Sequence, residues 1–118
     1  MADSFKSVSL KPSSTSNTIV YTVPTADQNS QPPILPTTTI IKSIRLANVS
    51  GNQVTTTVVM MDSSNLNLEV VLYKDGLAHE ATHEVLTNPI VLEKADQIKI
   101  TAATADAVEI LLSIMEIT

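Results

Sequence analysis

The sequence contains no cysteine, which excludes a disulfide framework and a thiol nucleophile. Aromatic residues are also scarce, at 3% of a chain that is 43% hydrophobic, and tryptophan is absent. The core must therefore consist mainly of valine, isoleucine and leucine. Because β-branched side chains fit a pleated sheet better than a helix, this composition favours β structure.

Glycine is almost missing as well, with two residues in 118. This excludes a glycine-rich phosphate loop, and the sequence has neither a G-x-S-x-G nucleophile elbow nor an Asp-rich calcium loop. The carboxylates that could in principle form acid-base pairs are Glu80, Glu84, Glu93 and Asp96. Charged residues between apolar positions on strands, however, normally face solvent. We predict no catalytic residues, no cofactor and no enzyme.

The two histidines stand in one motif, since residues 79–83 have the H-E-x-x-H pattern of zinc proteases. On a helix, His79 and His83 would share a face and reach one ion. On a strand they would lie about 13 Å apart, too far to share it. The flanking Asp75-Gly76 and Asn88-Pro89 favour extended backbone, and no further His or Cys supplies a third ligand. We predict no metal site.

The net charge of -5 argues against nucleic acid as a partner, because such a protein needs a basic surface to displace counterions. No run approaches the roughly 18 apolar residues of a membrane span, and the first residues lack the pattern of a secretion signal. We expect a protein made in the cytoplasm that binds neither nucleic acid nor membrane. Its length fits one domain.

Charge is unevenly distributed along the chain. Residues 1–61 contain two acidic and four basic residues, a balance of +2, and residues 62–118 contain ten acidic and three basic residues, a balance of -7. One part of the chain is therefore suited to attract the other part of a neighbouring copy. A merely solvated acidic face explains the pattern equally well.

Apolar residues alternate with polar ones along most of the chain, which indicates strands. The alternating segments are 19–23, 40–46, 54–60, 66–73, 98–100 and 108–114. In 66–73 the predicted core face carries Leu66, Leu68, Val70 and Leu72. Short strands at this spacing predict an all-β fold, a single antiparallel β-sandwich of the jelly-roll or immunoglobulin-like type with about eight or nine strands. Residues 107–116 also fit a helix, but alternation is the cleaner period there and we predict a strand.

Turn residues separate these segments. The predicted turns are Ser50-Gly51-Asn52, Asp62-Ser63-Ser64-Asn65, Asp75-Gly76, Lys94-Ala95-Asp96 and Thr104-Ala105-Asp106. Asn48-Val49-Ser50 matches a glycosylation acceptor, which we interpret as part of the first of these turns.

Two segments have no core pattern. We predict that residues 1–16 form an extended N-terminal arm, and that residues 17–118 form the sandwich with a long Pro-rich loop at 24–39. Long loops in compact domains are usually functional. The predicted partner contacts are Ile34, Leu35 and Pro36 in this loop, with Phe5 and Lys6 in the arm, although the single Phe also suits the chain's own core.

From about Thr37 onward the chain resembles a family of small β-sandwich virion proteins of tailed bacteriophages, many of them cyanophages. The stretches that carry this resemblance are TIIKSIRLAN (39–48), VLYKDG (71–76), NPIVLE (88–93), DQIKI (96–100) and VEILLSIMEI (108–117), with YTVP (21–24) upstream. One departure is Lys94-Ala95, where such sequences tend to have a glycine before the Asp of the turn.

The resemblance implies a non-enzymatic structural protein of the virion. Head decoration or cement is the leading role, by multivalent contact with the major capsid protein or other virion proteins, and a homo-oligomer is expected, with a trimer favoured. The alternatives are a neck, collar or tail accessory protein and, in another class, a host-glycan-binding module. The last is disfavoured because sugar stacking needs aromatic platforms and only Tyr21 and Tyr73 offer a phenol ring.

Overall fold

The structure is a computed structural model and describes residues 3–118. These residues form nine strands, and none of them is helical. The strands are β1 (Asp3–Leu10), β2 (Thr18–Thr22), β3 (Thr38–Asn48), β4 (Val54–Asp62), β5 (Leu68–Leu77), β6 (Thr82–Glu84), β7 (Ile90–Leu92), β8 (Gln97–Ala102) and β9 (Val108–Ile117). The all-β prediction is confirmed, and the segment 107–116 contains a strand. Within the described part no helix could span a membrane.

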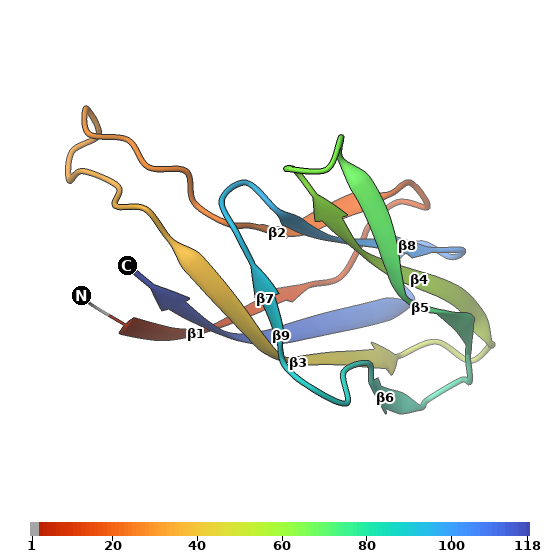
Figure 1. Ribbon diagram of the computed structural model, residues 1–118. Coiled ribbons are helices and arrows are strands. Elements are labelled where there is room, and N and C mark those ends of the chain that lie inside the picture. Colours follow the sequence, from red (N-terminus) through yellow and green to blue (C-terminus); the bar gives the residue numbers. More distant parts are fainter. Residues whose placement is uncertain (1–2) are drawn as a thin grey trace.

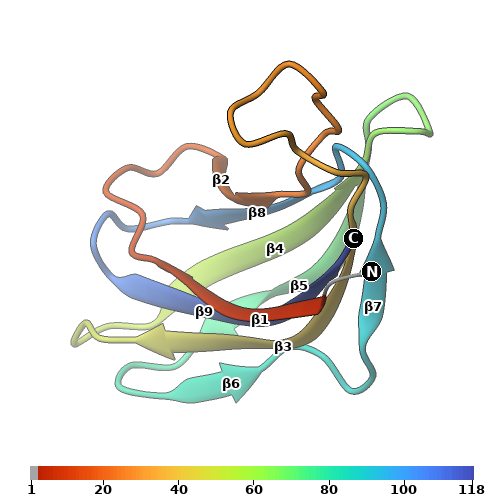
Figure 2. The same ribbon diagram turned by 90° about the vertical axis from the view of Figure 1, so that its left-hand side faces the viewer.

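The strands form two antiparallel sheets packed face to face (Figures 1 and 2). Sheet A has the order β1-β9-β3-β6, with β7 also paired to β3, and sheet B has the order β2-β8-β4-β5. Apart from the β4-β5 hairpin and the step from β6 to β7, each connection crosses from one sheet to the other. This is the strand order of a jelly roll rather than of an immunoglobulin domain, whose sheets are ABED and CFG.

The core lies between the sheets and is aliphatic, as the composition predicted. Alternate residues of β9 point inward, and Ile110, Leu112 and Ile114 are buried. They meet Ile98 and Ile100 of β8, which are fully buried from the other sheet. Each side chain of this kind contributes about 1.5 to 3 kcal/mol by leaving water.

Four of the five predicted turns connect strands, and one of them is held by a buried side chain. Asn48 is 2% exposed, and its amide donates to the carbonyls of Asn52 (2.8 Å) and Leu77 (2.9 Å). Its Oδ1 accepts from the Ser50 amide (2.9 Å) and hydroxyl (2.7 Å). The sequon Asn is thus part of the β3-β4 turn, as interpreted from the sequence.

The predicted turn at Asp75-Gly76 is wrong, because both residues lie inside β5 opposite Thr56 and Thr55. Gly76 has no positive φ. Gly76 instead leaves space for the side chain of Gln53, because a Cβ at position 76 would stand 2.1 Å from Nε2 of Gln53. The left-handed conformation occurs at Ala95, with φ of 66°, in the turn where the resembling family has glycine.

Two further predictions need correction. Half of the segment predicted as an N-terminal arm, residues 1–16, is strand β1, which pairs with β9 from Asp3 opposite Ile117 to Leu10 opposite Ile110. Residues 1–2 lie outside the described residues. The hydrophobic pattern did not predict this strand, because an edge strand of mostly exposed residues has little apolar alternation. The predicted core face of 66–73 is also largely exposed, with Leu66 at 97%, Leu68 at 51% and Val70 at 44%. A β-bulge between Val58 and Val59 shifts the register there.

Replacing Asn48 tests how the β3-β4 turn is held. We expect Asn48→Ala to lower the free energy of unfolding by about 2 to 3 kcal/mol, because two carbonyls and a backbone amide lose their partner at a buried site. Asn52→Ala is the matched control in the same turn, since Asn52 contributes hydrogen bonds there through main-chain atoms, and it should stay within about 0.5 kcal/mol of the parent. Urea unfolding followed by circular dichroism measures both. Equal losses in the two variants would contradict this role of Asn48.

Candidate interaction site

The loop between β2 and β3, residues 23–37, stands out from the sandwich (Figures 1 and 2). Its distal part is closed by two backbone hydrogen bonds between Asp27 and Ile34, both 2.9 Å. The amide of Asn29 also donates to Oδ1 of Asp27 (2.9 Å). Ile34 at this closure and the next two residues, Leu35 and Pro36, are exposed, with Ile34 39% and Leu35 57% exposed. The loop therefore presents apolar side chains on a hydrogen-bonded frame.

Asp96 braces the end of the sandwich from which this loop emerges. Its carboxylate is buried, and Oδ1 accepts from the amide (2.9 Å) and hydroxyl (3.0 Å) of Ser63 while Oδ2 accepts from the amide of Glu93 (2.9 Å). Its carbonyl accepts from the amide of Val23 (2.9 Å). One residue thus joins three segments, because its side chain binds the β4-β5 and β7-β8 turns and its main chain binds the start of the long loop. The sequence predicted Asp96 as part of a turn and as an acid-base candidate, and its bracing role depends on segments far apart in the chain.

A shallow groove of about 480 Å³ lies at the base of the long loop. Pro24 and Pro36 line it from the two ends of the loop, Val91 from β7, and Glu93 and Lys94 from the β7-β8 turn. Val91 is 58% exposed. The exposed apolar surface of the loop therefore continues toward sheet A instead of ending at the loop.

The two candidate residues of the predicted arm have opposite surroundings. Phe5 is on the outer face of sheet A and 69% exposed, with the ammonium of Lys42 5.2 Å from its ring centroid. It does not fill the chain's own core. Lys6 points the other way and places its Nζ 2.7 Å from Oε1 of Glu116. Phe5 is thus available to a partner, whereas Lys6 has an internal one.

Glu116 is the centre of a buried polar network near that end of sheet A. Besides Lys6, it accepts a hydrogen bond of 2.5 Å from the hydroxyl of Tyr21, which also lies 2.8 Å from the hydroxyl of Thr39. Burial alone would raise the pKa of the Glu116 carboxyl, but the hydrogen bonds and the charge of Lys6 outweigh it and lower this pKa. Burial, and next the bond to Glu116, raises the pKa of the Tyr21 hydroxyl far above its usual range. The network joins β1, β2, β3 and β9.

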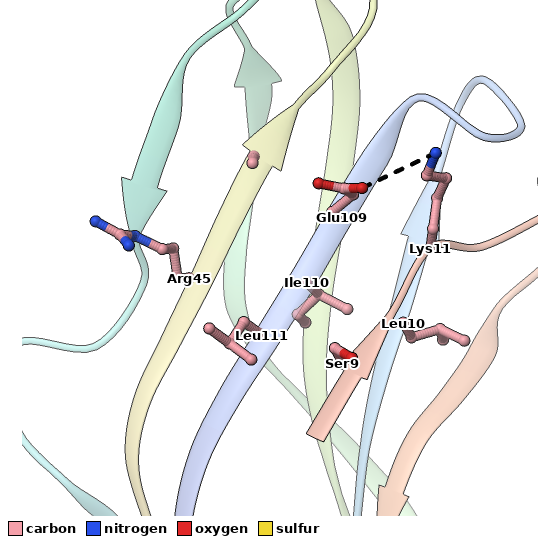
Figure 3. A pocket seen from close by; sticks show the side chains of 8 residues that line it. Ser9, Leu10, Lys11, Arg45, Glu109, Ile110 and Leu111 are labelled. Carbon is pink, nitrogen blue, oxygen red and sulfur yellow. Dashed lines mark ion pairs between the residues drawn. The ribbon is translucent and has the colours of Figure 1, made fainter. Parts of the chain in front are cut away.

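A second hollow, of about 600 Å³, lies on the outer face of sheet A (Figure 3). Ser9, Leu111 and Ala47 line it from β1, β9 and β3, and Arg45 and the ion pair between Lys11 and Glu109 (3.9 Å) also border it. It offers small and apolar side chains with charges beside them. This is a surface for packing, and it presents no pair of nucleophile and base.

The H-E-x-x-H motif is not on a helix. His79 and Glu80 are in a turn, where Glu80 has a φ of 57°, and His83 is in β6 with its ring 4.8 Å from that of Tyr73. Among residues 3–118, no group of three or more potential ligands is placed to hold a metal ion. Glu84 instead accepts from the hydroxyl of Ser43 and the amide of Ile44 (2.9 Å), so it serves as a structural acceptor.

No protein-family model matches the sequence, and the search of curated proteins gives no match. Solved structures do share its fold. A protein of the disulfide-linked pili known as Bacillus endospore appendages aligns with a TM-score of 0.50 at 15% identity, over 97% of this chain and 85% of that one. A chain of the IBDV viral particle aligns with a TM-score of 0.55 at 6% identity. The alignment covers 97% of this chain but only 30% of the IBDV chain. At these identities the likeness concerns the fold alone.

The buried Glu116 makes stability depend on pH. Its pKa is lowered in the folded protein, so its contribution is present above the unfolded pKa of about 4.3 and is lost as pH falls through the folded value. We expect Glu116→Gln to lower the free energy of unfolding at neutral pH by about 1 to 3 kcal/mol. The difference from the parent should shrink below about pH 4.

Chemical denaturation between neutral and acidic pH measures this difference. Glu109→Gln is the control, because the carboxylate of Glu109 is exposed and 3.9 Å from its lysine. It should change stability by less than about 1 kcal/mol at every pH. A Glu116→Gln deficit that stays constant into the acid range would contradict the charge-based account of this network.

Proposed function

We propose that this chain is a non-enzymatic structural protein of a bacteriophage particle, and that it decorates and cements the capsid. The observation that carries the proposal is the braced loop with Ile34, Leu35 and Pro36 exposed in sequence. The jelly-roll fold, which the chain shares with a protein of the IBDV viral particle, is consistent with it. So is the resemblance of the sequence to virion proteins of tailed phages.

The proposed mechanism is additive contact. The loop inserts its apolar side chains between subunits of the major capsid protein or other virion proteins, while the sandwich covers the shell, and many copies restrain it together. The protein is made in the host cytoplasm and resides in the virion as a homo-oligomer, for which the sequence favoured a trimer. Since β1 is held in sheet A, we assign the contact with the shell to the loop rather than to the predicted arm.

A neck, collar or tail position is the alternative within the virion. Copy number separates the two, because a shell protein is present in on the order of hundreds of copies and a neck or tail part in about a dozen. A glycan-binding module fits the structure less well. Tyr21 is committed to Glu116 and Thr39, and the ring of Tyr73 packs on His83, so neither forms an open platform for a sugar.

A fibre subunit is a second candidate, because this chain covers 85% of a protein of the Bacillus appendage pili. Those pili are disulfide-linked, whereas this chain has no cysteine. Any fibre it builds must therefore be held by non-covalent contacts. Electron microscopy of the concentrated purified protein distinguishes this candidate, since cement proteins need the shell to assemble and fibre subunits do not.

The loop contact is tested by Ile34→Ser combined with Leu35→Ser. If both side chains are buried on the shell, binding to capsids that lack the protein should weaken by at least about tenfold, because each apolar side chain removed from water contributes 1 kcal/mol or more. Val49→Ser is the matched control, since Val49 is 51% exposed in the β3-β4 turn at the other end of the sandwich. Co-sedimentation of labelled protein with capsids measures the affinity. Unchanged binding of the loop variant would refute the loop contact.

A further inference from the structure

The outer face of sheet A carries apolar side chains that are aligned across four strands. Phe5 lies opposite Met115, Met115 opposite Ile40, and Ile40 opposite Val91. Residues directly opposite each other in antiparallel strands point to the same face, so these four form one row, here called the apolar row. Phe5 and Val91 are 69% and 58% exposed, and Met115 and Ile40 are half-buried. The ammonium of Lys42 lies 5.2 Å from the ring centroid of Phe5 at one end of this row, and a contiguous outward row of apolar side chains marks an interaction surface.

The next row along the strands consists of small residues. Ser7 lies opposite Ser113, which lies opposite Ser43, and we call these three the serine row. On its far side lies the row of Ser9, Leu111 and Arg45, and these residues line the hollow described above together with Ala47, Lys11 and Glu109. The face therefore has a raised apolar row, a low serine row and a hollow, in that order along the strands.

We infer that the outer face of sheet A is a self-complementary interface for a second copy of this chain. A two-fold axis along the serine row places the apolar row of each copy over the hollow of the other. Phe5 then lies above the partner's Ser9, Met115 above the partner's Leu111, and Ile40 above the aliphatic part of the partner's Arg45. Ser7, Ser113 and Ser43 lie at the axis, where small side chains allow the two sheets to approach to about 10 Å. A two-fold contact of this kind is closed, as isologous dimers are.

Charge at the ends of β1 supports the same axis. The rotation that brings Phe5 over Ser9 also brings the exposed Asp3 of one copy over the exposed Lys11 of the other. Lys11 already neighbours Glu109 at 3.9 Å, so each such contact joins one cation to two carboxylates. An axis parallel to the strands would instead place apolar row against apolar row and leave both hollows empty. The placement of the apolar row over the hollow and the pairing of Asp3 with Lys11 thus favour the axis along the serine row.

The extent of the face suits a weak dimer. Four strands at about 4.8 Å spacing and nine residues at about 3.3 Å rise give roughly 570 Å² per copy, or about 1,100 Å² in total, near the lower limit for a specific interface. The proposed pair does not rest on the virion role. It also differs from the trimer favoured by the sequence, because a trimer requires a head-to-tail contact.

Sedimentation equilibrium from micromolar to submillimolar concentration tests the pair. We expect the mass to rise from 12.6 kDa toward twice that value. Ser113→Arg sets two cations against each other at the axis and should leave a monomer throughout. Thr57→Arg is the matched control, being half-buried in β4 and pointing outward from sheet B, and it should associate like the parent. Both variants should keep the circular dichroism spectrum of the parent.

The charged ends give an independent test by reciprocal exchange. Asp3→Lys should weaken association about tenfold, because two opposed pairs become repulsive in each dimer. Adding Lys11→Asp to the same chain should restore most of the affinity. A parent that stays monomeric, a trimeric mass, a Thr57→Arg variant that dissociates like Ser113→Arg, or a double exchange that rescues nothing would each overturn the proposal.

Discussion

The alternation of β9 is the constraint on which the rest of this structure depends. β9 is the central partner of both β1 and β3, and its residues Val108, Ile110, Leu112 and Ile114 are all buried in the single core. A shift of the register by one residue would move all of them to the outer face. Burial of these side chains therefore also fixes which residues of β9 point out, namely Leu111, Ser113 and Met115. The outer surface of sheet A is in this sense a consequence of the core.

The second constraint is that the buried polar groups need hydrogen-bond partners. Glu116, Asp96, Asn48 and Thr39 are buried, and each has hydrogen-bond partners in the described chain. Because an unpaired buried polar group costs 1 to 3 kcal/mol or more, these side chains tie together segments that the aliphatic core alone would not align. Asp96 acts at the loop end, Asn48 at the opposite end, and Glu116 at the junction of β1 with β2.

Part of the uneven charge along the chain is paired within one molecule. Lys6 pairs with Glu116 and Lys11 with Glu109, so two of the ion pairs join residues 1–61 to residues 62–118. The sequence suggested attraction between neighbouring copies because it does not reveal that β1 and β9 are adjacent strands. The charges that the proposed pair of copies would use are local, at Asp3 and at the exposed side of Lys11.

Alternation predicted the strands well where one side of a strand is buried, as in β3, β4, β8 and β9. It failed at β1 and in the first half of β5, which are edge strands with mostly exposed residues. Four of the five turns predicted from turn residues connect strands. Asp75-Gly76 is not a turn, because Gly76 lies inside β5, where the absence of a side chain leaves space for Gln53. The strand order, and with it the choice of a jelly roll, depends on pairings between distant segments that no local pattern carries.

The sequence singled out Ile34, Leu35 and Pro36 from the composition and length of the loop, and Phe5 as a residue of the predicted arm. The structure shows that these residues are exposed, and their contact with a partner stays a prediction. The sequence missed the alignment of Phe5 with Met115, Ile40 and Val91, since four strands from distant parts of the chain meet there. The role of Asp96 was missed for the same reason. A sequence shows which residues are apolar or charged. Whether residues of different strands share a face depends on the register of every strand that lies between them.

The two proposed surfaces constrain each other. A two-fold axis along the serine row runs across the strands, so it reverses their direction, and the long loops of the two copies point to opposite ends of the pair. Such a pair cannot press both loops onto one flat shell. It contacts the shell with one loop and directs the other away, or it bridges two components that face each other. If the sheet A pair persists on the particle, the protein connects surfaces as well as covering them, and its loop at the far end is free to hold a second component.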